Sequence, residues 1–214
     1  MDSNNINKTL KILGSIYPDA KCALNFNTAY ELLVATILSA QCTDVRVNII
    51  TMELFKEFNT PEDMITLSVE ELEVKVKSCG FYRNKSKNII NTTKYLLDNY
   101  NGKVPSTMEE LLKLPGVGRK TANVLIANAF GGQAIAVDTH VFRLANRIGL
   151  GIGSDPYKVE IAMMKNISQD MWSISHNYLI WHGRLVCKAR KPDCENCAIQ
   201  SLCDYNNGID NFKK

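Results

Sequence analysis

The segment Leu114-Pro-Gly-Val-Gly-Arg-Lys-Thr121 separates two runs with apolar residues at helical spacing, 108–114 and 121–130. Proline restricts the backbone, and glycine adopts left-handed angles without a Cβ clash. The pattern therefore predicts two helices joined by a tight turn at Gly116 and Gly118. The unpaired amides of the turn and of the second helix's first residues would face outward at the positive end of a helix dipole. Such a helix start is suited to bind a phosphate.

Lys120 lies at the predicted start of the second helix, directly after Arg119. A neighbouring cation and the positive end of a dipole both disfavour an ammonium, and so favour the uncharged amine. An unperturbed lysine is uncharged in only about one molecule in 2,500 at pH 7, whereas a lysine nucleophile must be uncharged. The residues therefore suggest a nucleophile, and the alternative is an ordinary phosphate-binding lysine.

The composition is that of a globular protein: 214 residues, of which 45% are hydrophobic and 22% charged. This length suits one large or two small domains. The polar start, MDSNNINKTL, does not resemble a signal peptide. No segment approaches the roughly 20 apolar residues that a membrane span needs. We therefore expect a cytoplasmic protein and no membrane contact.

The net charge of +3 is unevenly distributed. Residues 53–73 contain seven acidic residues and one lysine, whereas residues 83–147 contain ten basic and four acidic residues. The basic region includes the predicted turn, which favours a phosphate-rich partner. A charged stretch is otherwise most simply a solvated surface.

Helical patterns dominate, and the expected fold class is all-α. Capping boxes are predicted at Ser68 with Glu71 and at Ser106 with Glu109, and a proline start at Thr60-Pro61. Residues 134–137 form a short extended link that has no partner strand. The predicted helices span residues 5–16, 30–41, 45–58, 85–100, 139–148 and 173–186.

Four of the seven cysteines cluster near the C-terminus, as Cys187-x6-Cys194-x2-Cys197-x5-Cys203. Without a secretory signal, such a group indicates a metal site rather than disulfides. Thiolates suit zinc or an iron–sulfur cluster, and the spacing alone does not decide between them. The other three cysteines are expected to be buried free thiols. Between the first two ligands, a basic loop would face a phosphate backbone or simply solvent: Lys188, Arg190 and Lys191.

Taken in order, LPGVGRKTAN, AVDTH and the four cysteines resemble the endonuclease III family of helix-hairpin-helix DNA glycosylases, over nearly the whole chain. The resemblance implies a six-helix domain, residues 22–132, with the helix-hairpin-helix at 106–131. It also implies an iron–sulfur domain formed by residues 1–21 and 133–214, with a [4Fe-4S] cluster at 187–203. Damaged double-stranded DNA would bind in the cleft between the two domains, and we expect a monomer.

In that family the activity is base excision followed by strand cleavage at the abasic site. The resemblance implies that Lys120 attacks C1′ of an extruded nucleotide, and that β-elimination from the Schiff base nicks the strand on the 3′ side. Oxidised pyrimidines are the expected substrates. Asp138 would support the charge that develops on the sugar and accept a proton from the lysine. Its alternative role is to cap the helix that begins at Thr139.

Two further residues match family positions that distort DNA. Gln41 corresponds to the residue that fills the gap left by the extruded base; otherwise it is a polar helix-terminal residue. Phe81 corresponds to an apolar wedge that is commonly leucine; otherwise it is a core phenylalanine. Cys42 departs mildly from the family pattern, which often has a small residue there. His140, His176 and His182 are expected to be packing or surface residues without a chemical role.

Three other functions would account for part of these motifs. An adenine glycosylase relative shares the hairpin and the cysteines but lacks the lysine. A non-catalytic iron–sulfur DNA-binding module would not react with an abasic site. A binding protein stapled by zinc would contain no cluster.

Overall fold

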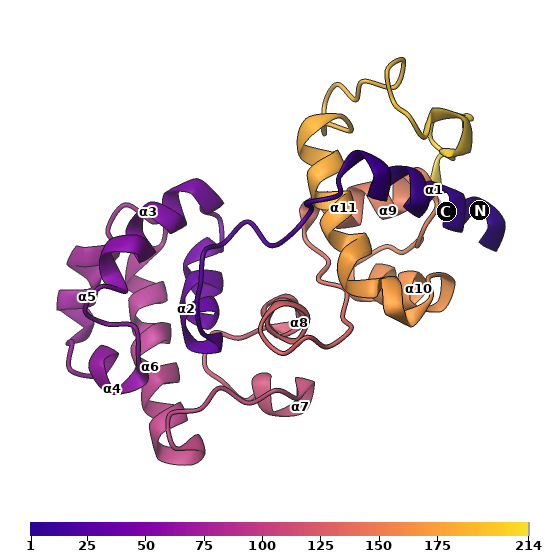
Figure 1. Cartoon of the computed structure of the whole chain (residues 1–214). Coiled ribbons are helices and arrows are strands. Elements are labelled where there is room, and N and C mark those ends of the chain that lie inside the picture. Colours follow the sequence, from indigo (N-terminus) through magenta and orange to yellow (C-terminus); the bar gives the residue numbers. More distant parts are fainter. Residues whose placement is uncertain (214) are drawn as a thin grey trace. The chain divides into compact units, whose positions relative to one another are not determined.

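The computed structural model describes residues 1–213, and within them regular secondary structure is helical, with no β-strand (Figure 1). This confirms the all-α prediction. Within the same residues, no helix has both the length and the apolar character needed to cross a bilayer. The α-helices are α1 (Ser3–Ile16), α2 (Ala29–Ser39), α3 (Asp44–Leu54), α4 (Pro61–Met64), α5 (Val69–Val76), α6 (Tyr82–Tyr100), α7 (Met108–Leu111), α8 (Arg119–Asn128), α9 (Thr139–Ile148), α10 (Pro156–Asn166) and α11 (Trp172–Leu185). Three short 3₁₀ helices span Gln169–Met171, Gln200–Leu202 and Asn211–Lys213.

The chain divides into two compact units. Unit 1 consists of Met1–Lys21 and Gln133–Lys214, and unit 2 of Cys22–Gly132. Unit 1 is therefore formed by two separate segments of the chain. Helix α1 of the first segment packs against α11 of the second.

Unit 2 is organised around α2. Every residue from Tyr30 to Leu38 is buried, and α3, α6 and α8 all pack against this helix. Glu31 is buried within the same segment because its carboxylate accepts a hydrogen bond of 2.6 Å from the amide of Asn27. A helix that is apolar nearly all round requires neighbours on every side, and α2 has them.

Unit 1 has a separate core, formed by apolar faces of α1, α9, α10 and α11. The extended link at residues 134–137 is buried, as expected of an apolar segment, and has no helical or strand structure. It leads directly into α9, which begins at Thr139 as predicted. The core of unit 1 thus positions the start of α9.

Most predicted helix starts are confirmed by the capping geometry. Thr60 caps α4 with proline at the first helical position, and Ser68 with Glu71 forms the predicted capping box of α5. The second predicted box is wrong by one residue: Thr107, not Ser106, caps α7. Both hydroxyls have a glutamate three residues later, so the pattern cannot separate them. The observed register buries Leu111 completely.

This register generates a stability prediction. Thr107→Ala should lower the free energy of unfolding by about 1 kcal/mol, because the side chain that caps α7 is lost. Ser106→Ala, the matched control on an exposed residue, should change it by less than about 0.5 kcal/mol. Urea unfolding of both variants measures the difference. Equal losses, or a larger loss for Ser106→Ala, would contradict the capping assignment.

Candidate functional site

The glycine turn between α7 and α8 is anchored in the core of unit 2. Leu114 and Val117 are buried at its two sides, and the amide of Val117 donates to the Leu114 carbonyl at 3.1 Å. Gly116 has φ +75°, a left-handed conformation that disfavours a side chain. A Cβ there would also lie 2.8 Å from the side chain of Asn88 on α6. Glycine is thus required at this position twice over.

Gly118 has a different role, because its φ of −97° suits any residue. An added Cβ would meet nothing within 4 Å. The prediction that both glycines would serve a left-handed turn therefore holds for Gly116 only. Gly118 is the N-cap of α8 and provides no side-chain hydrogen bond, whereas Thr28, Thr43 and Thr107 cap their helices through their hydroxyls. The first amides of α8 are thus free of a side-chain cap and lie beside open space.

Arg119 and Lys120 form the first turn of α8. Lys120 is exposed and Arg119 is partly buried. Positive side chains at a helix start are electrostatically unfavourable in the isolated helix, and an anion bound at the same helix start relieves the repulsion. The arrangement therefore suits a phosphate beside an exposed primary amine.

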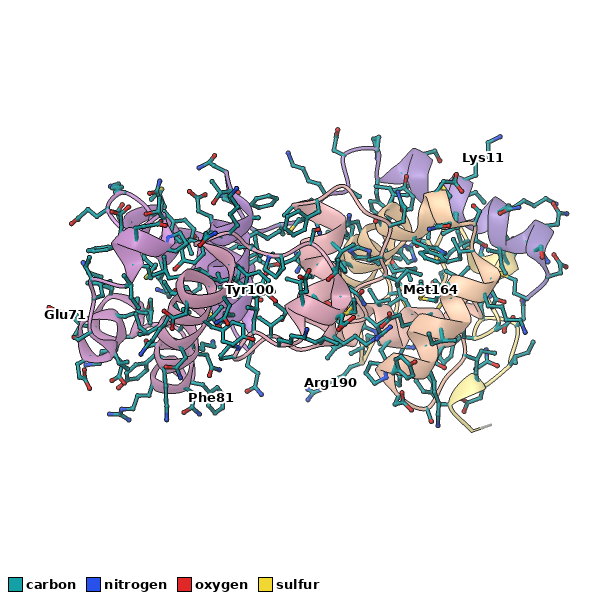
Figure 2. The ribbon with its side chains drawn as sticks, turned by 90° about the horizontal axis from the view of Figure 1, so that it is seen from below. Lys11, Glu71, Phe81, Tyr100, Met164 and Arg190 are labelled. Carbon is teal, nitrogen blue, oxygen red and sulfur yellow. The ribbon has the colours of Figure 1, made fainter. Side chains whose placement is uncertain are left out.

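An open pocket of about 260 Å³ lies next to the turn, entirely within unit 2. Its lining brings together the predicted residues Gln41, Phe81 and Gly116, from three separate parts of the chain. Phe81 is 64% exposed and projects from the surface (Figure 2). The alternative that it is a core residue is therefore wrong. Thr121 lines the same pocket, one residue beyond Lys120.

Gln41 and Phe81 share an unusual backbone conformation. Their φ angles are +52° and +57°, in the left-handed region. For a residue with a Cβ this conformation costs about 1–2 kcal/mol. Gln41 follows the end of α2 and Phe81 precedes α6. The strain sets both side chains at helix ends, where they border the pocket.

Three residues of α6 that sequence reasoning missed also line this pocket: Asn84, Lys85 and Asn88. Lys85 is 5% exposed, and its ammonium donates to the Leu38 carbonyl at 2.9 Å, near the end of α2. Thr92, one turn beyond Asn88, donates to the Pro115 carbonyl. No motif marks these residues. The only signal was the helical spacing of Lys85, Asn88 and Thr92.

Asp138 lies in unit 1 and is the N-cap of α9. Its Oδ1 accepts a hydrogen bond of 2.8 Å from the amide of Val141. The capping role that the sequence left open is therefore present. Only one carboxylate oxygen is used in this contact, so the other can serve a further partner.

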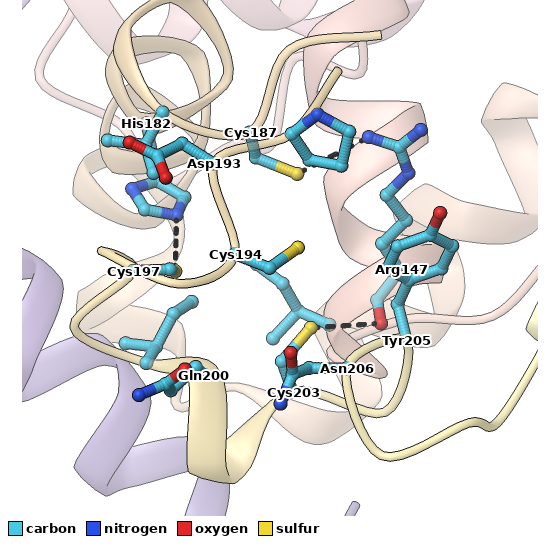
Figure 3. A pocket seen from close by; sticks show the side chains of 14 residues that line it. Arg147, His182, Cys187, Asp193, Cys194, Cys197, Gln200, Cys203, Tyr205 and Asn206 are labelled. Carbon is cyan, nitrogen blue, oxygen red and sulfur yellow. Dashed lines mark hydrogen bonds between the residues drawn. The ribbon is translucent and has the colours of Figure 1, made fainter. Parts of the chain in front are cut away.

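The four C-terminal cysteines all line one cavity in unit 1 (Figure 3). Within residues 1–213, no three Cys, His, Asp or Glu side chains are arranged to hold a single metal ion. Burial raises the pKa of the Cys197 and Cys203 thiols. Because these side chains do not converge on one point, the four thiols surround the cavity.

Two side chains that the sequence did not single out contact these sulfurs. Arg147 donates to Cys187 Sγ at 3.5 Å and to the carbonyls of Lys188 and Ala189 at 2.9 Å each. It thereby holds the backbone of the basic loop, whose side chains Lys188, Arg190 and Lys191 are exposed.

The second is His182, whose Nε2 lies 3.4 Å from Cys197 Sγ and whose Nδ1 lies 2.9 Å from the Tyr17 hydroxyl. Burial lowers the pKa of His182 to about 4, so the ring is neutral at pH 7. The tautomer protonated on Nε2 satisfies both contacts: Tyr17 donates to Nδ1, and Nε2 donates to the sulfur. The sequence predicts only a packing or surface role for His182, and this contact is visible only in the fold.

Comparison with known proteins places the chain among DNA repair proteins. Residues 34–169 match the family described as HhH-GPD superfamily base excision DNA repair protein. Endonuclease III of Rickettsia conorii is 47% identical over 205 residues, covering 96% of this chain and 98% of that protein. Endonuclease III of Escherichia coli K12 is 45% identical, covering 90% and 92% respectively.

Solved structures agree with these relatives. A trapped covalent intermediate of an endonuclease III with DNA has a TM-score of 0.92 and 45% identity, covering 97% of this chain and 98% of that one. A thermostable thymine-DNA glycosylase has a TM-score of 0.85 at 22% identity, covering 96% and 98%. The second likeness concerns the fold alone.

Proposed function

Because the chain belongs to the endonuclease III family of the HhH-GPD superfamily of base excision DNA repair proteins, we propose that it excises oxidised pyrimidines and nicks the strand through a lysine Schiff base. It is a DNA N-glycosylase and abasic-site lyase. One observation supports the finer proposal most directly. The uncapped start of α8 carries an exposed primary amine, and Gln41 and Phe81 border the pocket beside it.

The proposed partner is damaged double-stranded DNA, bound by a monomer. The amides of Gly116, Gly118 and Lys120 would donate hydrogen bonds to a phosphate, with the guanidinium of Arg119 adding charge. Lys188, Arg190 and Lys191 are exposed on a loop whose backbone Arg147 holds. They would contact phosphates elsewhere on the duplex and contribute affinity without reading sequence.

The target atom, C1′ of the damaged nucleotide, is inaccessible inside a duplex, so the nucleotide must be extruded. Gln41 and Phe81 are suited to this step, since both lie at helix ends and border the pocket. The amide of Gln41 would hydrogen-bond the base left without a partner. The ring of Phe81 would stack between neighbouring bases, which repays part of the unstacking cost.

The chemistry then falls to Lys120. The lone pair of its uncharged Nζ attacks C1′, the glycosidic bond breaks, and the base leaves with the electron pair and a proton. The sugar ring then opens as the C1′–O4′ bond breaks and O4′ takes a proton, which leaves C1′ and Nζ joined as a Schiff base. This Schiff base is an electron sink. Loss of a proton from C2′ then expels the 3′ phosphate, and water releases the enzyme. Lysine thus couples base excision to strand cleavage.

Asp138 would act on the same nucleotide as Lys120. Its carboxylate would stabilise the positive charge that develops on the sugar and accept a proton from the attacking amine. The hydrogen bond to Val141 fixes the orientation of this carboxylate. Capping and catalysis are therefore compatible in one residue.

We further propose that Cys187, Cys194, Cys197 and Cys203 hold a [4Fe-4S] cluster. One metal ion draws its sulfur ligands to about 2.3 Å from a single centre. Four thiols spread around a cavity instead fit a group with several metal atoms, with Arg147 and His182 donating to the sulfurs. When bound, such a cluster would hold together the C-terminal segment and the basic loop.

The first test of this function is borohydride trapping with an abasic-site duplex. Wild-type enzyme should form a covalent adduct, and Lys120→Gln should form none while its affinity for the duplex stays within about threefold. Lys113→Gln is the matched control, because Lys113 is a half-exposed lysine in the same hairpin; it should trap normally. Peptide mapping should place the DNA on residue 120. An adduct in Lys120→Gln, or none in the wild type, would contradict the mechanism and favour a binding module.

The second test separates the two roles of Asp138. Asp138→Asn keeps a side chain that caps well, so stability should change by less than about 0.5 kcal/mol. Excision of an oxidised pyrimidine should slow by about 100-fold or more, because the charge is lost. Asp138→Ala should slow excision to a similar extent and should also lower the free energy of unfolding by about 1 kcal/mol. If Asp138→Asn turns over at the wild-type rate, capping is the residue's whole role.

The third test concerns the metal. The purified protein should contain iron and acid-labile sulfide and absorb visible light. Cys194→Ser should lose most of the iron and unfold at lower denaturant concentration, because the loop loses its anchor. Cys22→Ser is the control outside the cavity and should retain both the iron and the wild-type resistance to denaturant. Zinc in place of iron and sulfide in the wild type would contradict the cluster assignment.

A further inference from the structure

Two of the three remaining cysteines meet in unit 2. Cys42 and Cys79 are 37 positions apart in the chain, yet the Cys42 thiol donates to Cys79 Sγ at 3.7 Å. Sequence reasoning expected three scattered, buried thiols. Only Cys79 is buried, at 1% exposure, whereas Cys42 is partly accessible. The pair thus combines one thiol within reach of solvent with one enclosed partner.

The two thiols lie in the turns that carry the DNA-distorting residues. Cys42 directly follows Gln41, and Cys79 lies two residues before Phe81. Each turn is closed by its own backbone hydrogen bond. The Cys42 amide donates to the Ser39 carbonyl at 3.0 Å, and the Cys79 amide donates to the Val76 carbonyl at 2.9 Å. The geometry of each turn is therefore well defined before any link between them forms.

The backbones of the two turns also lie close together, since a Cβ built on Gly80 would come within 3.6 Å of the Gln41 carbonyl oxygen. The neighbouring thiols of Cys42 and Cys79 offer a place where the two turns could be joined covalently.

We propose that Cys42 and Cys79 form a reversible disulfide that links these two turns and lowers the enzyme's affinity for damaged DNA. The role given to Gln41 and Phe81 in this proposal rests on the proposed function. An S–S bond of about 2.05 Å requires the sulfurs to approach by about 1.7 Å from their separation of 3.7 Å. Side-chain rotation and a small shift of the two turns can provide this movement.

The chemistry is thiol–disulfide exchange with a low-molecular-weight disulfide as the oxidant. The thiolate of Cys42, the accessible partner, attacks one sulfur of the reagent and expels one small thiolate. The thiolate of Cys79 then attacks the Cys42 sulfur and expels the second, so two protein thiols are oxidised and one small disulfide is reduced to two thiols. Burial raises the pKa of Cys79 to about 11. The second step is therefore the slower one, and Cys42 reacts first.

The disulfide would act on DNA binding through the positions of the inserted side chains. With the turns free, Gln41 and Phe81 can adjust separately to the extruded nucleotide's gap. With the turns joined, the spacing between the two side chains is fixed at its DNA-free value. Reversible disulfides in reducing compartments commonly serve such sensing roles.

The experiment uses the complete protein with its metal content intact, treated with oxidised glutathione and followed by visible absorbance. Remaining thiols are alkylated, and peptides are mapped by mass spectrometry. We expect a Cys42–Cys79 linked peptide with the loss of two hydrogen atoms, and its disappearance after dithiothreitol. Affinity for a duplex with a stable abasic-site analogue should fall by about tenfold, within the range for losing one base–aromatic stack.

Two variants control the result. Cys42→Ser should bind the duplex equally well before and after oxidation, because the link cannot form. Cys22→Ser, which removes a thiol outside the pair, should respond as the wild type does. A mixed disulfide that stays on Cys42 would overturn the proposal, as would a Cys42–Cys79 link that leaves DNA affinity unchanged. Neither readout needs catalysis, so failure of the lysine trap would refute the proposed function separately.

Discussion

The packing of α6 against the glycine turn is the constraint on which the candidate site in unit 2 depends. Asn88 lies where a side chain on Gly116 would be, and Thr92 binds the carbonyl before that glycine. One turn earlier, Lys85 binds the end of α2. A single helix face therefore fixes both the turn that would bind phosphate and the helix end from which Gln41 projects. The glycine turn and the end of α2 therefore keep a fixed position relative to each other, because both are bound to α6.

Local signals in the sequence predicted much of this architecture. Capping residues, proline starts and apolar spacing located most helix starts, since each depends on a few neighbouring residues. The choice between Ser106 and Thr107 could not be made in the same way. Two equivalent hydroxyls were available, and only the burial of Leu111 in the fold distinguishes them. The local sequence identifies the possible starts of α7, and the burial of Leu111 determines which one is used.

Long-range relations were beyond the reach of the sequence. Lys85 resembles any basic residue on a helix until its ammonium is seen against the Leu38 carbonyl. The neighbouring thiols of Cys42 and Cys79, and the contacts of Arg147 and His182 with the cysteine cavity, depend equally on the fold. The resemblance to a family supplied expectations for Lys120, Asp138 and the cysteines. It carried no information on the residues that support them.

The left-handed backbone at Gln41 and Phe81 has a consequence for how this protein can be improved. Glycine would relax both positions, so laboratory evolution that screens only for heat resistance would be drawn to those replacements. The selected variants would be more stable but would lack the two side chains proposed to enter the double helix. Stability and the proposed recognition of damage therefore place opposite demands on the same two φ angles, and this sequence retains the less stable conformation.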